Sequence, residues 1–210
     1  MRSCLRLLAV TALWLVMFNT ATAHADVPRA ADGNGVMVGS NDALAQLEIF
    51  CDPQCPYCAE LESTYGDRIA GDLASGRLAV TYRWLTFLDD KRHNDISARV
   101  GNALFSAADP TTSVTAYQAF VQDLYRHQSS DGPNNGEIAA MARESRIPEA
   151  VADRIAAGDH AVDTAAVSDA NRARLDQVNS ENPGTPTVYD LRANRVVDIQ
   201  DPAWLDALSG

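Results

Sequence analysis

Three cysteines within eight residues, Cys51, Cys55 and Cys58, constrain the fold of this 210-residue chain more than any other feature of its sequence. They follow a largely apolar run at residues 45–50 that is typical of a buried strand, and Pro56 is favoured at the first position of a helix. Apolar residues then recur at helical spacing, at Leu61, Tyr65, Ile69 and Leu73. The pattern predicts that the cysteines lie where a buried strand leads directly into a helix.

The spacing of Cys55 and Cys58 suits thiol–disulfide chemistry. Two cysteines three positions apart at the start of a helix can close a small disulfide ring, and Cys55 would lie where unpaired backbone N–H groups favour negative charge. We therefore expect the pKa of Cys55 to be well below the ordinary value of about 8.5, since the thiolate is the attacking species. Cys58, one turn further in, is expected to be the less accessible, resolving thiol.

Two other uses of the cysteines remain open at this point. Cys51 could join the pair as a third soft ligand, which would make the chain a metal-handling protein that carries Cu(I) or zinc. The histidines are scattered without the spacing of a matching ligand pair, and we expect neither a resident metal nor a cofactor. The Cys55–Cys58 pair could also stay oxidised in a redox-inactive binding module, although so short a loop gains little from a disulfide.

The N-terminus has the pattern of a secretory signal peptide. Two arginines and no acid precede a short apolar run at residues 7–18, and Ala23 and Ala25 occupy the small-residue positions before a cut. The run is too short to cross the hydrocarbon core of a bilayer in the usual way. We expect a signal peptide at residues 1–25, a flexible tether at residues 26–35, and export to the periplasm, the cell envelope or the medium.

Charge excludes one class of partner. The chain has a formal net charge of -11 and a single lysine, Lys91. So acidic a surface repels phosphate backbones, and we expect no nucleic-acid partner. The cysteines of an exported protein commonly form a disulfide framework, but that requires cysteines spread along the chain, and the three that remain once the signal peptide with Cys4 is removed are clustered. They are expected to be reactive.

The remaining pattern predicts an α/β fold. Alternating apolar residues at 78–84 predict a second strand, and a strand–helix–strand unit makes a parallel pair. Residues 94–180 change to helical spacing and predict four or five helices that pack as a unit. Strand patterns return at 187–191 and 195–199 as an antiparallel hairpin, followed by a terminal helix. We expect a four-stranded mixed sheet with an all-helical insertion at about 94–180, in a domain covering residues 36–210.

A second motif lies just before the hairpin. The segment Gly184–Thr187 reads G-T-P-T, and Pro186 precedes a strand, which is a typical place for a cis peptide bond. A cis bond here would expose the backbone of Thr185. Its N–H and C=O groups could then pair with an extended substrate segment as an added strand does.

With these features the sequence resembles the DsbA-like family of thioredoxin-fold proteins. Ile49–Cys58 is similar to the active-site segment of that family, and Gly184–Val188 is similar to its cis-proline loop. The resemblance implies a thioredoxin fold, Cys55 as the nucleophile and Cys58 as the resolving cysteine. It implies that the substrate-facing residues are Pro56, Tyr57, Thr185 and Pro186. It also implies that the chain forms, reduces or isomerises disulfides in reduced or misoxidised exported proteins, and that a membrane redox partner recycles the pair.

The acidic residues near the cysteines depart from this family. A buried glutamate often lies six residues before the first cysteine in the family, but this chain has Ile49 there. Glu48 beside it should point to the other face of the strand, where we expect it to be solvated. Glu60, Glu62 and Asp67 flank the active helix, and we expect them to stabilise its start and to aid solubility.

Cys51 is not explained by the resemblance. Strand alternation places it on the same side as Leu47 and Ile49, which indicates burial. We therefore expect Cys51 to be buried and inert, with a high pKa. The alternative is that it points toward Cys55, forms a different disulfide and biases the chain toward isomerisation.

Overall fold

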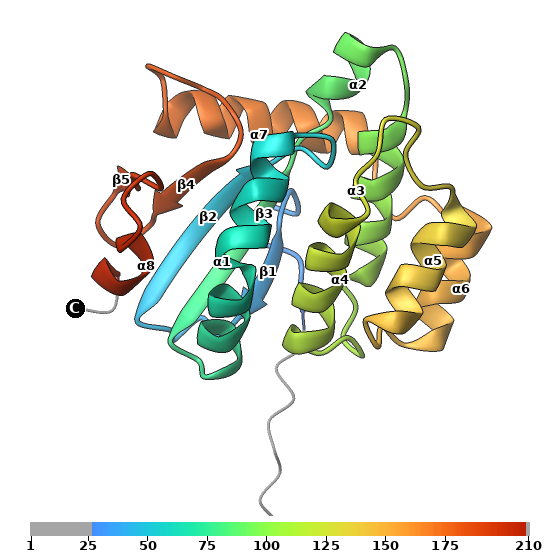
Figure 1. The fold of residues 1–210 in the computed structure, drawn as a ribbon, viewed down its shortest axis with the longest axis horizontal. Coiled ribbons are helices and arrows are strands. Elements are labelled where there is room, and N and C mark those ends of the chain that lie inside the picture. The colour runs from blue at the N-terminus through green and yellow to red at the C-terminus, as the bar shows by residue number, and fades with distance from the viewer. Residues whose placement is uncertain (1–26, 209–210) are drawn as a thin grey trace, which may run out of the picture.

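The cysteines lie at the end of a central strand of a mixed β-sheet. The computed structural model describes residues 27–208, so the expected signal peptide at residues 1–25 falls outside the described residues. The sheet has the strand order β1-β3-β2-β4-β5 (Figure 1). Its strands are β1 (Val36–Gly39), β2 (Ala45–Cys51), β3 (Leu78–Trp84), β4 (Thr187–Asp190) and β5 (Arg195–Val196).

A strand–helix–strand unit forms the centre of the sheet, as predicted. Strands β2 and β3 run parallel with Cys51 aligned with Trp84, and helix α1 (Pro56–Ala74) makes the crossover. Both strands are buried along nearly their whole length, which explains their continuous apolar character. Gly76, with φ of 74°, follows α1 in the left-handed conformation that glycine adopts at low steric cost, and the chain then turns back into β3.

The sheet has one strand more than the four that were expected. The edge strand β1 pairs antiparallel with β3, so the sheet contains five strands. Strand β4 pairs antiparallel with β2 and with β5, which confirms the predicted hairpin. Residues 27–35, expected to be a flexible tether, pack against the domain instead, because Val27 is fully buried and Arg29 forms an isolated bridge with Val36.

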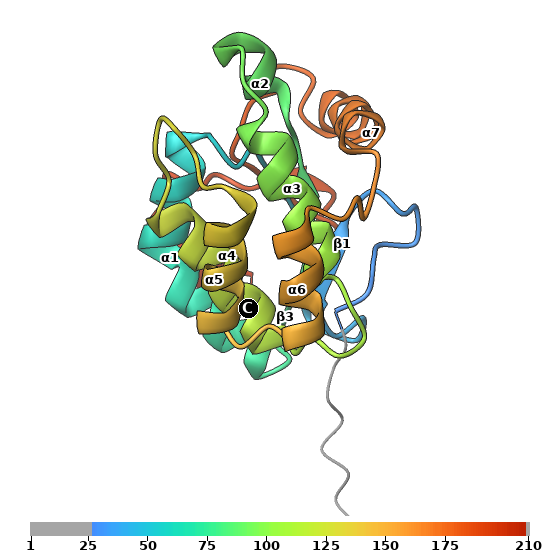
Figure 2. The ribbon, with the colours of Figure 1, turned by 90° about the vertical axis from the view of Figure 1, so that its right-hand side faces the viewer.

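Five helices occupy the predicted insertion. They are α3 (Ile96–Ala107), α4 (Val114–Arg126), α5 (Asn135–Glu144), α6 (Glu149–Ala157) and α7 (Thr164–Val178). Helices α3 to α6 contact one another beside the sheet, and α7 contacts both α3 and β3 and lies across the sheet from α1 (Figures 1 and 2). A short helix, α2 (Phe87–Arg92), precedes them and was missed because four of its six residues are charged.

Helix α1 is held between the sheet and α4 by one buried stripe. The stripe consists of Cys58, Leu61, Glu62, Gly66, Ile69 and Leu73. A Cβ atom at Gly66 would lie 2.6 Å from the side-chain nitrogen of Gln122 on α4, so a larger residue would displace that amide. The two helices therefore pack tightly one turn beyond Glu62.

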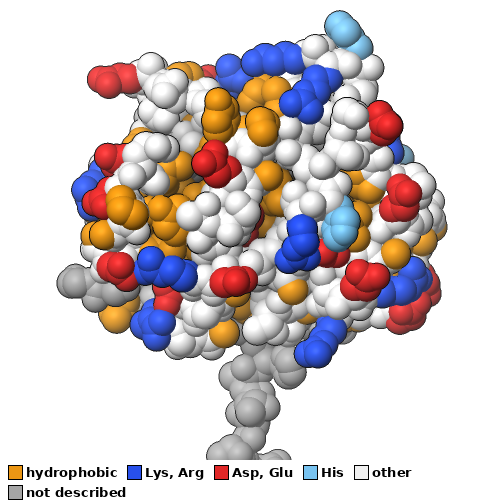
Figure 3. Space-filling view, in the orientation of Figure 1, with side chains coloured by type: hydrophobic (Ala, Val, Ile, Leu, Met, Phe, Trp, Pro, Cys, Tyr) orange, Lys and Arg blue, Asp and Glu red, His pale blue; other side chains and the backbone are white. Residues whose placement is uncertain are grey.

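The remaining features lie at the periphery. The terminal helix α8 (Trp204–Ala207) buries Trp204 against Tyr65 of α1, with the two rings edge to face and 5.4 Å apart. Acidic and basic side chains are interspersed around apolar areas on the face shown in Figure 3. Across residues 27–208, the structure contains no helix that is long and apolar enough to span a bilayer.

Candidate active site

The C-P-Y-C segment forms the start of α1. Cys55 is the N-cap residue and Pro56 is the first helical residue, as predicted, because proline has a suitable φ and no N–H group to leave unpaired. The cysteines of the described residues are all free, so this is the reduced form. Cys55 is 5% exposed and Cys58 is fully buried, whereas the residues between them are exposed, with Tyr57 at 66%.

The cis-proline loop faces Cys55. The Thr185–Pro186 peptide bond is cis, which confirms that prediction. Cys55 Sγ donates a hydrogen bond of 3.3 Å to the backbone oxygen of Thr185, so residues 130 positions apart meet at the site. The loop is held by Thr187, whose hydroxyl donates to the backbone oxygen of Gly184 at 2.7 Å. Thr185 and Pro186 are both half-buried at this junction.

In the reduced site the thiols of Cys55 and Cys58 hold their protons tightly. The hydrogen bond with Cys58 and burial raise the pKa of Cys55. Burial and the interaction with Cys51 raise the pKa of Cys58 well above its ordinary value. The prediction of a low pKa at Cys55 is therefore wrong for the reduced form, because its neighbours outweigh the favourable position at the helix N-terminus.

Cys51 belongs to the same cluster of thiols. It is 1% exposed, which confirms the prediction of burial, and burial raises its pKa. Its thiol interacts with Cys58 and with the Tyr125 hydroxyl, whereas its influence on Cys55 is only through charge. Cys58 therefore lies between the other two thiols, and Cys51 faces Cys58 where the alternative prediction had it face Cys55.

Glu62 is the functional candidate that the sequence interpretation missed. It was expected to serve solubility, but it is 3% exposed and lies one helical turn beyond Cys58 on the buried stripe of α1. Its carboxylate accepts hydrogen bonds from the Tyr82 hydroxyl at 3.2 Å and from the Gln118 amide at 3.0 Å. Burial raises its pKa to about 7. The signal available in the sequence was the four-residue spacing from Cys58, which puts both side chains on one helix face.

The hydrogen bonds around Glu62 suit a carboxyl group that gains and loses a proton. Tyr82 has one hydroxyl proton, and it faces two acceptors, Glu62 at 3.2 Å and the side-chain oxygen of Gln118 at 2.7 Å. When Glu62 is protonated it can donate to Tyr82, which then donates to Gln118. When Glu62 is ionised, Tyr82 must turn its proton to the carboxylate. Both protonation states therefore have a satisfied arrangement.

A cavity connects Glu62 with the surface. It lies between α1 and α4, and the residues that line it include Glu62, Ser63, Gln122, Tyr125 and Arg126. Tyr125 reaches the thiols on its other side, since its hydroxyl interacts with Cys51. Glu62 therefore stands between the buried thiols and solvent, where a proton can be exchanged.

Glu48 was expected to be solvated, and this prediction is wrong. The side chain is 2% exposed and lies between two arginines on the face of the sheet opposite Ile49. Arg83 Nε donates to one carboxylate oxygen at 2.8 Å and Arg174 donates to the other at 2.8 Å. Glu48 is thus an ion-paired structural residue and is not part of the thiol site.

A polar network fixes the loop between Cys51 and Cys55. Asp52 is fully buried and accepts hydrogen bonds from the Ser97 hydroxyl and from the backbone N–H groups of Gln54 and Leu88. Gln54 in turn donates to Asp89 at 2.6 Å. Burial raises the pKa of Asp52 to about 6. The network anchors the active-site loop to α2 and α3.

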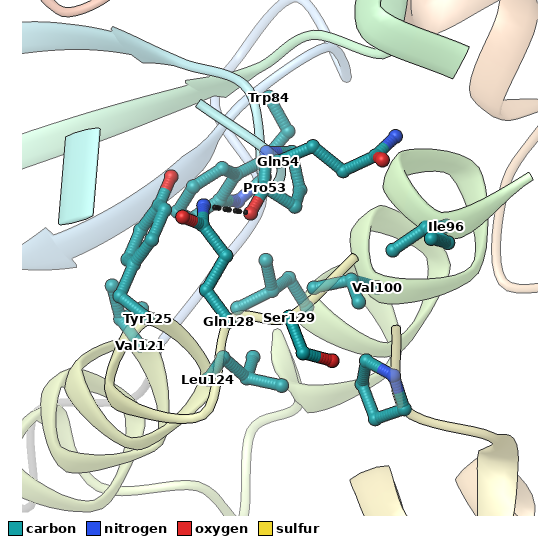
Figure 4. Close-up of a pocket in the computed structure, with 12 residues that line it drawn as sticks. Pro53, Gln54, Trp84, Ile96, Val100, Val121, Leu124, Tyr125, Gln128 and Ser129 are labelled. Atoms are coloured by element: carbon teal, nitrogen blue, oxygen red, sulfur yellow. Dashed lines mark hydrogen bonds between the residues drawn. The ribbon is translucent and has the colours of Figure 1, made fainter. Parts of the chain in front are cut away.

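An apolar cavity of about 20 Å³ lies behind this loop (Figure 4). Tyr125 and Trp84 flank it together with aliphatic side chains of α3 and α4. Gln128 closes one side, where its amide donates to the backbone oxygen of Pro53 at 2.8 Å. The cavity places an apolar wall beside the active-site loop.

A metal centre is not apparent in the part of the chain that the structure describes. Residues 27–208 contain no group of three or more histidine, cysteine or acidic side chains arranged to hold a metal ion. Cys51, Cys55 and Cys58 lie instead in one buried core cluster, in which the thiol of Cys58 interacts with each of the other two.

A mixed sheet with a C-x-x-C pair at the start of its crossover helix, opposed by a cis-proline loop, defines a thioredoxin-fold dithiol protein. A family model described as Thioredoxin matches residues 31–193, and the chain belongs to this family. Helices α3 to α6 are the insertion that this fold carries here.

Solved structures agree with this fold, and the chain also matches part of a protein kinase. The fold is similar to MdbA, a thiol-disulfide oxidoreductase from Corynebacterium diphtheriae, with a TM-score of 0.72, 20% identity, and coverage of 87% of this chain and 92% of that chain. It is also similar to reduced DsbG from Mycobacterium tuberculosis, with a TM-score of 0.65, 24% identity, and coverage of 83% and 85%. Over 184 residues the chain is 31% identical to the serine/threonine-protein kinase PknE of M. tuberculosis. That match covers 84% of this chain and 32% of the kinase, so the chain spans about a third of the length of this relative.

Proposed function

We propose that this chain is an exported thiol–disulfide oxidoreductase that forms, reduces or isomerises disulfides in other exported proteins. The observation that carries the proposal is the Cys55–Cys58 pair at the N-terminus of α1, with Cys55 Sγ 3.3 Å from the backbone oxygen of Thr185. Membership of the thioredoxin family and the names of proteins with the same fold support it. A membrane redox partner recycles the pair.

The chemistry is thiol–disulfide exchange through a mixed disulfide. In the oxidising direction, a substrate thiolate attacks Cys55 of the Cys55–Cys58 disulfide, and Cys58 leaves and takes up a proton. A second substrate thiolate then attacks the substrate sulfur, which releases Cys55 and completes the substrate disulfide. In the reducing direction Cys55 attacks first and Cys58 resolves the mixed disulfide. Burial of Cys58 restricts the attack of substrate to Cys55.

Glu62 exchanges the proton of the buried thiols. Cys58 and Cys51 are enclosed, so a proton that either of them gains or loses needs a titratable neighbour. Glu62 is buried beside them, has a pKa of about 7 and lines the cavity between α1 and α4. Many members of the family carry a glutamate for this purpose on the strand, at the position of Ile49. In this chain Glu62 of helix α1 takes over that role.

Backbone pairing beside Cys55 holds the substrate. Within residues 27–208, the N–H group of Thr185 has no hydrogen-bond partner, and its carbonyl group is bonded only to the Cys55 thiol. An extended substrate segment can pair with both groups when its own sulfur replaces the Cys55 contact. The exposed ring of Tyr57 and the half-buried Pro186 flank this segment and provide apolar contacts.

Turnover assays test the proposal directly. The oxidised chain from Asp26 to Gly210 should accelerate disulfide formation in a reduced model protein and insulin reduction in the presence of a thiol. Cys55→Ser should abolish both activities, and Cys58→Ser should accumulate a mixed disulfide with the substrate because no thiol remains to resolve it. Full turnover by both variants would show that this pair is not the catalytic one. The Cys58→Ser chain, incubated with membrane fractions, should also trap the recycling partner.

A further inference from the structure

Cys58 has two thiol neighbours, and the proposed reaction uses only one of them. Cys55 lies at the helix N-cap and Cys51 at the end of β2, and both are buried in the same core cluster as Cys58, with whose thiol each of them interacts. Both contacts are buried, and Cys51 has no route to solvent of its own, being 1% exposed. A buried cysteine that only filled space would not need to face a redox-active thiol.

We propose that Cys51 is a second disulfide partner of Cys58, and that the oxidised chain interconverts between a Cys55–Cys58 and a Cys51–Cys58 disulfide. This inference rests on the proposed function, because it requires that the Cys55–Cys58 disulfide forms. It adds a source of disulfide isomerisation that the two-cysteine reaction lacks.

The exchange is balanced and needs no external oxidant or reductant. The Cys51 thiol loses its proton, and the thiolate attacks Cys58 Sγ. The Cys55–Cys58 bond breaks as the Cys51–Cys58 bond forms, and Cys55 leaves as the thiolate. The Cys51 sulfur enters the disulfide and the Cys55 sulfur leaves it. The chain has one disulfide before and after the step, so its oxidation level does not change.

Glu62 is placed to accept the proton. The charge on its carboxylate acts on Cys51, and the group lines the cavity that reaches solvent. The Tyr125 hydroxyl lies near the Cys51 thiol and donates its proton to the backbone oxygen of Asp52 at 3.3 Å, and it can turn this proton to the thiolate as it forms. The base and the hydrogen-bond donor that the step requires are therefore both available within the buried cluster.

The product differs from the starting disulfide in where its free thiol lies. In the Cys51–Cys58 form the bridge is buried, and Cys55 is a free nucleophile at the N-terminus of α1, facing Thr185. This thiolate can attack a wrong disulfide in a misoxidised protein. A thiol of that protein then attacks the mixed disulfide, so a different disulfide forms and Cys55 is released. An oxidised chain can thus shuffle substrate disulfides without first being reduced.

The decisive experiment removes Cys55. The Cys55→Ser chain, equilibrated with oxidised glutathione, should lose two thiols and give a Cys51–Cys58 peptide after maleimide alkylation, pepsin digestion at acid pH and mass mapping. Cys51→Ala combined with Cys55→Ser should give only a glutathione adduct. A Cys55→Ser chain that carries glutathione on Cys58 and keeps Cys51 free would overturn the inference. Thermal melts of each variant establish that it is folded.

The wild-type chain provides a second test that needs no substitution. Oxidised wild-type protein, alkylated and mapped in the same way, should contain a fraction with the Cys51–Cys58 bridge and an alkylated Cys55. The ratio of its isomerase activity on a scrambled substrate to its oxidase activity should fall severalfold in Cys51→Ala. If only the Cys55–Cys58 bridge is found and this ratio is unchanged, the inference fails while the proposed function stands. If the wild-type chain catalyses no exchange at all, the proposed function itself fails.

Discussion

Glu48 and Glu62 are buried to the same extent, at 2% and 3% exposure, on opposite faces of one sheet. Glu48 is enclosed by the guanidinium groups of Arg83 and Arg174, which satisfy both carboxylate oxygens. Among the described residues no cation forms an ion pair with Glu62, which is held by the neutral donors of Tyr82 and Gln118. The comparison teaches that burial alone does not assign a role to an acid. Its partners do, because cations fix the charge whereas neutral donors leave the proton free to move.

The largest effect is expected at Glu48. Glu48→Ala leaves the buried Arg83 with only the exposed Asp32 as its ion-pair partner within residues 27–208 and removes the partner of Arg174, which should lower the free energy of unfolding by on the order of 3 kcal/mol. Urea unfolding at neutral pH measures it. The exposed Glu60, on the surface of α1, provides the control, and Glu60→Ala should change little. Equal stability of the two variants would mean that the arginine pair does not need its carboxylate.

The next effect is a pH dependence caused by Glu62. The folded-state pKa of about 7 exceeds the ordinary value of 4.5, so the folded chain binds this proton more tightly and is stabilised at low pH. That contribution is lost as the pH rises from about 4.5 through about 7, and it amounts to about 3 kcal/mol in all. Glu62→Gln stays neutral and should become more stable relative to wild type over this range. A difference that does not change with pH would contradict the raised pKa.

Glu62→Gln should also slow the redox reaction. We expect a loss on the order of tenfold in the rate at which substrate thiols reduce the Cys55–Cys58 disulfide, because water in the cavity substitutes poorly for the carboxylate. Stopped-flow fluorescence against pH measures it. The wild-type profile should contain an inflection near the pKa of Glu62, and the variant should lack it. Glu48→Gln, if folded, should keep the wild-type inflection, which would confirm that only one of the two acids serves the thiols.

The smallest effect concerns the neutral donors themselves. Gln118→Leu removes the amide that donates to Glu62 and stabilises its charged form, so the pKa of Glu62 should rise further, by about half a unit. Carboxyl carbon chemical shifts followed by NMR would give the midpoint. A downward shift would mean that the Gln118 amide does not face the carboxylate in solution.

The fold was largely predictable because its signals are local. Pro56 after a cysteine N-cap, apolar residues every four positions, and the alternating pattern of β3 each report on a few neighbouring residues. The cis bond at Thr185–Pro186 followed from a motif just before a strand. The helix that the sequence did not predict was the short, charged α2, because its composition does not differ from that of a loop.

The partners of charged groups were not predictable, because they come from elsewhere in the chain. Glu48 meets Arg174 across 126 residues, and Glu62 meets Gln118 across 56. Neither spacing leaves a pattern in the sequence, and both acids were therefore expected at the surface, where most glutamates lie. The prediction of a low pKa for Cys55 was wrong for the same reason. Its position at a helix N-terminus is local information, whereas its enclosure by Cys58 and Thr185 depends on the assembled site.

The 130 residues that separate Cys55 from Thr185 also set the order in which the site can form. Strand β2 and α1 can pair with β3 from neighbouring sequence, but β4 joins β2 only after the whole helical insertion has been accommodated. Closing so long a loop is an entropically costly, late event in folding. A chain interrupted anywhere before β4 therefore carries the dithiol without the loop that orients a substrate. Redox competence is acquired with the last long-range pairing of the sheet.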